Sequence, residues 1–151
     1  MRAVVSRVTG ARVLVDGEVV GKIGPGLAVL VGVTHADTAA EADWLARKIV
    51  NLRVFDDDGG RPNRSVLEAG GEVLVVSQFT LFGDASAGRR PSYIEAARPE
   101  HAEPLVAEVA AKLAAAGVQV ATGRFRAHML VEQTGDGPFT ILLDSATSRR
   151  R

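Results

Sequence analysis

The 151-residue sequence contains no cysteine, which excludes disulfides, thiolate metal sites and a cysteine nucleophile. Aromatic residues make up only 5%, and the formal net charge is zero, so no broad positive field marks the chain as a nucleic-acid-binding protein. No apolar run approaches the roughly 20 residues that a membrane-spanning helix requires. The opening residues, MRAVVSRVTG, lack the apolar segment of a signal peptide, so we expect a cytoplasmic protein with no membrane partner.

Hydrophobic residues make up 46% of the chain and charged residues 24%, which is typical of a soluble globular domain. The length fits one ordinary domain, and the sequence shows no internal repeat and no linker. We therefore predict a single domain over residues 1–145, followed by a basic and frayed tail at 146–151.

The first half of the chain carries the turn signals of β-structure. Asp16-Gly17 separates two short strand-like segments, 12–15 and 18–22, and this dipeptide favours a type I′ hairpin turn because both central residues need positive φ. The glycines and proline at 24–26 predict the next turn. The continuously apolar segment 27–33 then predicts a central strand covered on both faces.

Two segments have the end signals and the spacing of helices. Thr38 with Glu41 matches a capping box, and Pro99 and Gly117 suit the first turn and the end of a second helix. Apolar residues at helical spacing follow each start: Ala42, Leu45, Ile49 and Leu52 in the first helix, and Leu105, Val106, Val109, Ala110 and Leu113 in the second.

The remaining strands are predicted at 72–82, 118–121, 129–133 and 139–143, with a turn at 134–138 between the last two. Strands and helices do not alternate regularly along the chain. The order instead predicts an α+β fold, with an antiparallel or mixed sheet curled toward a barrel and two main helices packed on one side.

The strand at 72–82 ends in polar residues. Ser77, Gln78 and Thr80 follow an aliphatic run, and a buried polar group costs about 1–3 kcal/mol unless it finds a partner. This strand end is therefore predicted to meet a polar network or to face a pocket. Thr80 is the best hydroxyl candidate for a nucleophile, although its residue type alone favours an ordinary strand threonine.

Other candidate sites are weaker. The aspartates at 56–58 lack the ligand spacing of an EF-hand and suggest a solvated turn. The three histidines do not have the spacing of metal ligands: His35, His101 and His128. His101 is predicted to lie on the surface near the start of a helix. Neither a nucleophile elbow nor a phosphate-binding glycine loop is present.

Three polar features each admit a plain and a functional interpretation. Arg89-Arg90 could hold phosphates or simply belong to a polar loop. Gly137-Pro138 could be an ordinary turn or a cis peptide, because cis bonds are favourable chiefly before proline. Arg7, among apolar neighbours on the first strand, could be no more than a strand-edge charge.

Taken together, these segments resemble the D-aminoacyl-tRNA deacylase family. The resemblance covers residues 1 to about 145, and its opening part includes Arg7-Val8, the Asp16-Gly17 hairpin and residues 23–27 and 51–53. Its main motifs are Ser77-Gln78-Phe79-Thr80-Leu81, Gly88-Arg89-Arg90-Pro91-Ser92 and Asp136-Gly137-Pro138-Phe139-Thr140.

The resemblance implies a homodimeric, barrel-like fold that uses no metal and no organic cofactor. The implied reaction is hydrolysis of the ester that joins a D-amino acid, or glycine, to the 3′ end of tRNA. A cis Gly137-Pro138 would reach into the partner subunit's pocket and exclude L-amino acids, with Arg7 holding the dipeptide. Asp136, Phe139 and Thr140 would form the neighbouring loop.

The same resemblance makes Ser77, Gln78, Phe79 and Thr80 the catalytic side of the pocket. Arg89 and Arg90 are the predicted tRNA contacts, with Arg124, Arg126 and the tail as further candidates. Two positions depart from the family pattern. Gly135 stands where an asparagine is usual, and Phe139 stands where a small aliphatic residue is usual.

Two mechanisms remain open for this site. In the first, backbone N–H groups near Phe79 and Thr80 polarise the ester carbonyl, and water attacks with help from the 2′-hydroxyl of the tRNA. In the second, the Thr80 hydroxyl is a nucleophile that forms a covalent intermediate. Two rival functions are a non-catalytic RNA-binding barrel and a general serine or threonine hydrolase of small esters.

Overall fold

The computed structural model describes residues 1–148, and a mixed sheet forms the centre of the fold. The strand order is β2-β1-β3-β6-β7, and β8 also pairs with β1. β3 runs parallel to β6 and β6 runs parallel to β7, whereas β1 pairs antiparallel with each of its neighbours. The bounds are β1 Arg2–Val15, β2 Glu18–Ile23, β3 Gly26–Gly32, β6 Glu72–Ser77, β7 Gln119–Thr122 and β8 Leu130–Asp144.

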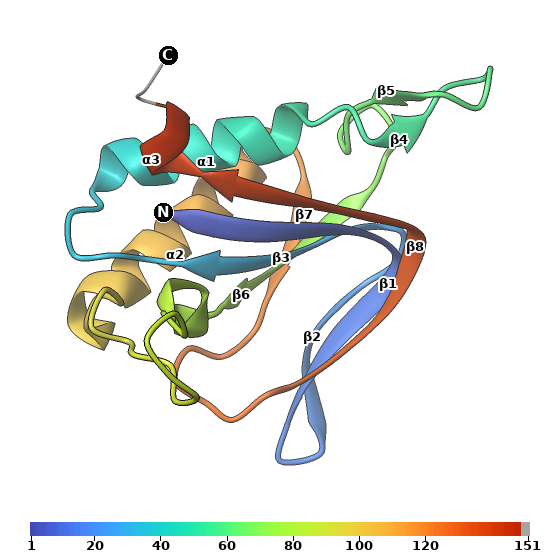
Figure 1. Cartoon of the computed structure of the whole chain (residues 1–151). Helices are drawn as coiled ribbons and strands as arrows, with labels where there is room; N and C mark the ends of the chain where they lie inside the picture. The colour runs from blue at the N-terminus through green and yellow to red at the C-terminus, as the bar shows by residue number, and fades with distance from the viewer. Residues whose placement is uncertain (149–151) are drawn as a thin grey trace.

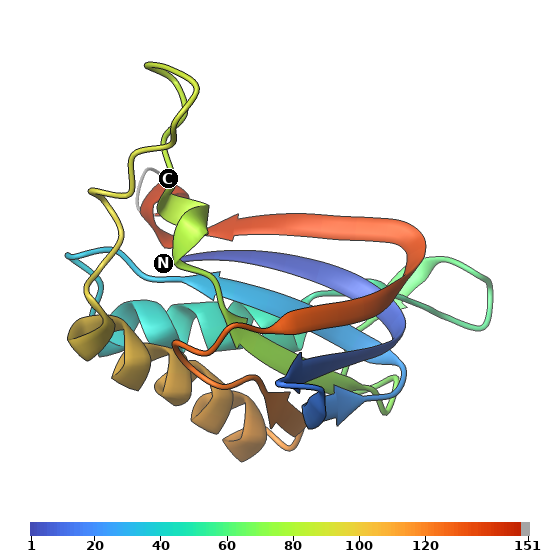
Figure 2. The ribbon, with the colours of Figure 1, turned by 90° about the horizontal axis from the view of Figure 1, so that it is seen from below.

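Two helices, α1 (Ala39–Asn51) and α2 (Pro99–Ala115), cover one face of this sheet, as Figures 1 and 2 show. The predicted capping box is confirmed, since the Thr38 N–H donates to Glu41 over 2.7 Å and the Ala40 N–H donates to the Thr38 hydroxyl over 3.2 Å. The predicted end of the second helix is also confirmed, with Gly117 at a φ of 99° just beyond it.

The sheet curls until its two ends approach one another. A Cβ atom on Gly21 in β2 would lie 2.2 Å from the carbonyl oxygen of Thr122 in β7, so only glycine permits this contact. One apolar cluster, which includes Leu45 and Leu113, packs between the sheet and the helices. A second cluster, which includes Leu74, fills the inside of the curl. The predicted α+β class and the near-closure into a barrel are confirmed.

Local signals in the first half of the chain predicted the structure well. Asp16 and Gly17 have φ values of 49° and 79°, as the predicted hairpin turn requires. β3 is buried along nearly its whole length. A small separate hairpin, formed by β4 (Phe55–Asp56) and β5 (Pro62–Arg64), extends away from the body of the molecule (Figure 1).

The predicted strand over 72–82 is wrong beyond Ser77. After β6 the chain forms a 3-10 helix, η1 (Phe79–Phe82), in which the Leu81 N–H donates to the Gln78 carbonyl over 3.2 Å. η1 packs directly on Gly32 at the end of β3, where a Cβ atom would lie 3.0 Å from Leu81 Cβ. The chain turns here because the missing side chain of Gly32 leaves space in which Phe82 is buried, and β6 does not continue its pairing with β3.

The prediction of two separate strands at 129–133 and 139–143 is also wrong. β8 is one strand of 15 residues, because it pairs with β1 on both sides of an irregular stretch. That stretch contains residues 136–138 of the predicted turn, which therefore form a bulge within one strand rather than a loop between two.

The first residue and the start of α3 (Ser145–Ser148) meet near the starts of α1 and α2. The Met1 ammonium lies 2.6 Å from an Asp37 carboxylate oxygen and donates to the Ser145 hydroxyl over 2.7 Å. His101 is exposed, as predicted, and its Nε2 lies 2.8 Å from the Asp37 carbonyl oxygen. Of the predicted tail, residues 146–148 belong to α3, and 149–151 lie outside the described residues.

None of the helices within residues 1–148 is both long enough and apolar enough to cross a membrane.

Candidate active site

A cavity of about 600 Å³ opens where β3 and β6 end. The two strands are parallel, so their carboxyl ends meet at the same edge of the sheet. The floor is aliphatic, with Val31, Val33 and Val76 at its base. The walls come from Ser77, Gln78 and Phe79, from Tyr93, from the first turns of α2, and from the segment that follows β7: Phe125, Arg126, Ala127, His128 and Met129.

The residues at the end of β6 form one wall of this cavity. The Gln78 N–H donates to the Val31 carbonyl over 2.7 Å, which fixes the wall to β3. Ser77 and Gln78 are half-buried, whereas Phe79 is 57% exposed. The Phe79 ring meets Tyr93 edge to face, with centroids 5.2 Å apart. Thr80 is exposed beside the cavity, and its hydroxyl accepts a short hydrogen bond from the Gln78 amide.

The backbone N–H groups of Phe79 and Thr80 are free donors. They begin η1, where a helical turn offers its first N–H groups no partner, and neither has one among residues 1–148. Their position beside the cavity suits them to stabilise negative charge on the oxygen of a substrate carbonyl.

The second predicted motif lies in an irregular part of β8. Ser6 of β1 pairs with Thr140, and Val8 pairs with Gly135, so the single residue Arg7 lies opposite residues 136–139. These residues leave the ladder and form what we call the 136–139 bulge. It contains a cis peptide bond between Gly137 and Pro138.

Glycine is required at position 137. Its φ is 135°, and a Cβ atom would lie 2.7 Å from the Phe139 backbone nitrogen. Gly137 and Pro138 are both exposed, so the bulge presents backbone to its surroundings rather than to its own core. At the foot of the bulge, the Ser6 and Thr140 hydroxyl oxygens lie 3.3 Å apart.

Arg7 is the main contact of β1 with the bulge. Its Nε donates to the Asp136 carbonyl over 3.1 Å and lies 3.5 Å from the Asp136 carboxylate. Its Nη1 donates to the Val54 carbonyl over 2.6 Å. The guanidinium also lies over the Phe139 ring, with Cζ 5.0 Å from the centroid. Arg7 is therefore a half-buried structural contact and not a free strand-edge charge.

The two predicted halves of the site lie far apart within one chain. Arg7, opposite the bulge, pairs with Leu27 near the start of β3, whereas Ser77 pairs with Val31 near its end. Four steps along a strand span about 13 Å. In Figures 1 and 2, η1 and the bend of β8 accordingly lie at opposite ends of the sheet.

The predicted tRNA contacts Arg89 and Arg90 do not line the cavity. They are exposed in the loop that follows η1, which Figure 2 shows extending away from the body of the fold. Asp84 and Ser92 close this loop with two backbone hydrogen bonds of 2.8 Å. The Ser86 N–H donates to the Asp84 carboxylate, which lowers the pKa of Asp84.

Sequence reasoning assigned Arg126 only to general tRNA contact and missed His128 and Tyr93, all three of which line the cavity. Arg126 has a φ of 67°, an uncommon conformation for a residue other than glycine. The available signal was topological. If β6 and β7 had been recognised as parallel, the segments after both strands would have been expected at the same edge of the sheet.

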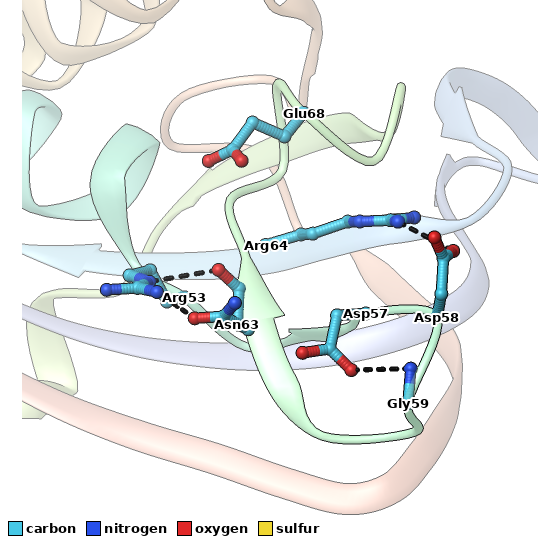
Figure 3. Close-up of a pocket in the computed structure, with 7 residues that line it drawn as sticks. All are labelled: Arg53, Asp57, Asp58, Gly59, Asn63, Arg64 and Glu68. Carbon is cyan, nitrogen blue, oxygen red and sulfur yellow. Dashed lines mark hydrogen bonds and ion pairs between the residues drawn. The ribbon is translucent and has the colours of Figure 1, made fainter.

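A second cavity, of about 650 Å³, lies beside the β4–β5 hairpin (Figure 3). Arg64 and Asp58 form an ion pair of 2.7 Å in it, and Arg53 donates to the Asn63 side chain. Asp57 accepts hydrogen bonds from the backbone N–H groups of Arg61 and Gly59, which lower its pKa. The residues predicted as a solvated acidic turn thus form one. Residues 1–148 contain no cluster of three or more histidine, aspartate or glutamate side chains arranged to hold a metal.

Comparison with known proteins identifies the family. The family model described as D-Tyr-tRNA(Tyr) deacylase matches residues 4–144. The chain belongs to this family. A D-aminoacyl-tRNA deacylase of Symbiobacterium thermophilum is 59% identical, with 96% of each chain covered. One of Chloroherpeton thalassium is 51% identical over the full length of both chains.

Solved structures share the fold of this chain. A structure named c-Myc DNA unwinding element binding protein has a TM-score of 0.91 and 40% identity, over 96% of this chain and 99% of that one. A "probable eukaryotic D-amino acid tRNA deacylase" has a TM-score of 0.82 at 16% identity, which shows a shared fold. The resemblance noted from the sequence motifs is therefore confirmed for the deacylase family as a whole.

Proposed function

We propose that the cavity at the end of β6 is the catalytic pocket of a chiral proofreading enzyme, and that the 136–139 bulge of a second subunit completes it. As a member of the deacylase family, the chain hydrolyses the ester bond of D-aminoacyl-tRNA. The observation that carries the proposal is the separation of the two motifs, which lie at opposite ends of β3 within one chain.

A homodimer resolves this separation. In one chain the bulge is exposed and lies away from the cavity at the end of β6, where Phe79 is 57% exposed with no bulge above it. Exposed apolar side chains on β8, with Leu142 at 77% and Leu130 at 57%, supply surface that a second copy would cover. A monomer would accordingly be inactive or unselective.

Hydrolysis at this site needs positioning more than strong catalytic groups, because an aminoacyl ester is already activated. The free N–H groups of Phe79 and Thr80 bind the carbonyl oxygen as water attacks the carbonyl carbon. The bond to the 3′ oxygen then breaks, and the tRNA leaves with a proton on that oxygen. The 2′-hydroxyl of the terminal adenosine assists the proton transfer.

The alternative mechanism uses the Thr80 hydroxyl as the nucleophile. Activation of a threonine requires a nearby base. The hydroxyl's described partner within residues 1–148 is the Gln78 amide, which donates to it and does not remove its proton. The geometry therefore favours the mechanism with backbone donors and water.

Selection against L-amino acids is steric in this proposal. The exposed backbone of Gly137 and Pro138 faces the α-carbon of the bound aminoacyl group, and it leaves room for hydrogen but none for an L side chain. Such a filter works by adding repulsion to the wrong substrate. Achiral glycine would pass it, so glycyl-tRNA is expected to be a substrate as well.

The tRNA approaches from the side where the cavity opens. Arg126 and His128 at its rim suit the terminal phosphates, and the aliphatic floor suits the face of a terminal base. Arg89 and Arg90 lie on the neighbouring exposed loop and would contact the acceptor stem. Because aminoacylated tRNA is made and used there, we place the activity in the cytoplasm.

The deciding experiment compares matched D- and L-aminoacyl-tRNAs, a glycyl-tRNA and a small ester that carries no nucleotide. The proposal expects hydrolysis of the D- and glycyl-tRNAs and little hydrolysis of the other two. Efficient cleavage of the small ester would instead support a general hydrolase. Binding of tRNA without hydrolysis would support a non-catalytic RNA-binding barrel.

A further inference from the structure

We propose that Phe139 and residues 54–56, which lead into and form β4, position the 136–139 bulge by fixing the Arg7 guanidinium, and so determine how strictly L-aminoacyl groups are rejected. This inference rests on the proposed function, since it assumes that the bulge is the chirality filter.

Arg7 joins the bulge to a part of the fold outside the sheet. Its shortest contact in this region goes to the Val54 carbonyl, 2.6 Å away, and the Asp56 carboxylate lies 3.6 Å from the same nitrogen. The contact with the bulge itself, to the Asp136 carbonyl, is longer at 3.1 Å. The guanidinium is thus anchored at the start of β4, and the bulge is held by an arginine that is itself fixed.

Phe139 supplies the remaining side of this arrangement. Its ring lies beneath the guanidinium, and its own side chain packs on the cluster between sheet and helices. A cation over an aromatic face is attracted by the ring quadrupole, and an aliphatic side chain offers no such attraction. The Arg7 side chain is 12% exposed, so solvent weakens this attraction little.

Phe139 also touches the filter directly. A Cβ atom on Gly137 would lie 2.7 Å from the Phe139 backbone nitrogen and 3.1 Å from Phe139 Cβ. The residue therefore contacts Gly137 through its backbone and Arg7 through its ring. Loosening the ring contact would let Arg7 and the Asp136 carbonyl move together, which displaces the backbone that meets the substrate.

Two side chains on the β4–β5 hairpin offer a matched comparison. Asp56 lies near Arg7, whereas Asp58 pairs with Arg64 and makes no described contact with Arg7. Both are exposed carboxylates on the same short hairpin, at 53% and 95% exposure. Only the Asp56 charge is expected to influence the filter, and only weakly, because exposed pairs are largely screened.

The test measures the ratio of kcat/KM for D- and L-aminoacyl-tRNA in Phe139→Leu, Phe139→Tyr, Asp56→Asn and Asp58→Asn. Phe139→Leu should lower the ratio about fivefold to tenfold, the size of one cation–π contact, and Phe139→Tyr should retain it because the ring remains. Asp56→Asn should lower the ratio about twofold at low salt, and Asp58→Asn should leave it unchanged.

Two controls separate this inference from the proposed function. Ile141→Val trims a half-buried side chain two residues further along β8, and should change thermal stability without changing the ratio. Gly137→Ala tests the filter itself. If Gly137→Ala lowers the ratio while Phe139→Leu does not, the positioning role is overturned and the filter stands. If neither variant lowers the ratio, the filter assignment fails and the positioning role fails with it.

Discussion

β3 and β6 on one side of the molecule, and β8 on the other, show two different ways of using a strand. β3 and β6 are aliphatic and buried, and their parallel pairing brings two strand ends to one edge, where the cavity opens. β8 is exposed over most of its length and leaves its ladder opposite Arg7. In our proposal, the buried pair fixes where the substrate binds, and the exposed strand carries the element that selects it.

Under the proposed dimer, this contrast explains why one chain holds both motifs at opposite ends of its sheet. A filter that packed against its own cavity would have to be buried, and it could not then meet a second subunit. Placing the bulge on an exposed strand leaves its backbone free for an external contact. Substitutions in the scaffold and in the filter should therefore have separable effects.

Damage to the scaffold should lower stability and leave selection intact. Leu74 is fully buried inside the curl of the sheet, so Leu74→Ala should lower the free energy of unfolding by about 2–5 kcal/mol. Chemical denaturation measures this loss. The ratio of D- to L-aminoacyl-tRNA hydrolysis in the folded fraction should stay unchanged, and a clear fall in that ratio would contradict the division.

Damage to the filter should lower the selection against L-aminoacyl-tRNA. Gly137→Ala places a Cβ atom against the Phe139 backbone, so the bulge must move. A displacement of about 1 Å in a positioning element can change rates on the order of 100-fold. We therefore expect a fall of that size in the ratio of D- to L-aminoacyl-tRNA hydrolysis. Kinetics with both aminoacyl-tRNAs measure it, and an unchanged ratio would show that Gly137 is not the filter.

Arg126, at the rim of the cavity, is expected to affect both the stability of the fold and the binding of tRNA. Arg126→Gly should raise the free energy of unfolding by about 1 kcal/mol, because glycine adopts the positive φ of 67° without steric cost. The same change removes a charge that we propose faces the tRNA, so KM should rise and its dependence on salt should weaken. If stability rises while KM and its salt dependence stay the same, Arg126 does not contact the tRNA.

Thr80 should matter least. Its hydroxyl bonds with Gln78, while its backbone N–H is the proposed donor to the substrate. Thr80→Val keeps the N–H and the shape of the side chain, so kcat should stay within about threefold. If the Thr80 hydroxyl were a covalent nucleophile, its removal would lower kcat by at least on the order of 100-fold. A loss of that size would favour the covalent mechanism.

The sequence predicted those parts of the fold whose signals are local. The Asp16-Gly17 turn, the Thr38 capping box and the apolar run in β3 each depend on neighbouring residues and were recognised correctly. The turn into η1 depends on Gly32, which is distant in sequence and leaves space for it. The continuity of β8 depends on pairing with β1 beyond the bulge, which no local pattern reveals.

The candidate site divides in the same way. Polar residues after an aliphatic run predicted a pocket at Ser77 and Gln78, and both line the cavity. The importance of Gly137-Pro138 came from family resemblance, because as a pattern it was compatible with an ordinary turn. His128 was missed because its place at the cavity follows from the parallel pairing of β6 and β7.

If the filter of one subunit acts on the pocket of the other, mixed dimers should reveal it. Gly137→Ala chains have an intact pocket and a damaged filter. Phe79→Pro chains keep the filter but lose the N–H and the aromatic ring at the pocket, with proline at a position that tolerates it as the first residue of η1.

The measurement is the hydrolysis of L-aminoacyl-tRNA per Gly137→Ala chain, after co-refolding with increasing excess of Phe79→Pro chains. If the filter acts across the dimer, hydrolysis of L-aminoacyl-tRNA falls toward the wild-type level while hydrolysis of D-aminoacyl-tRNA persists. Each working pocket then receives an intact filter from its partner. If hydrolysis of L-aminoacyl-tRNA stays constant at every excess of Phe79→Pro chains, each chain screens its own substrate and the filter does not act across the dimer.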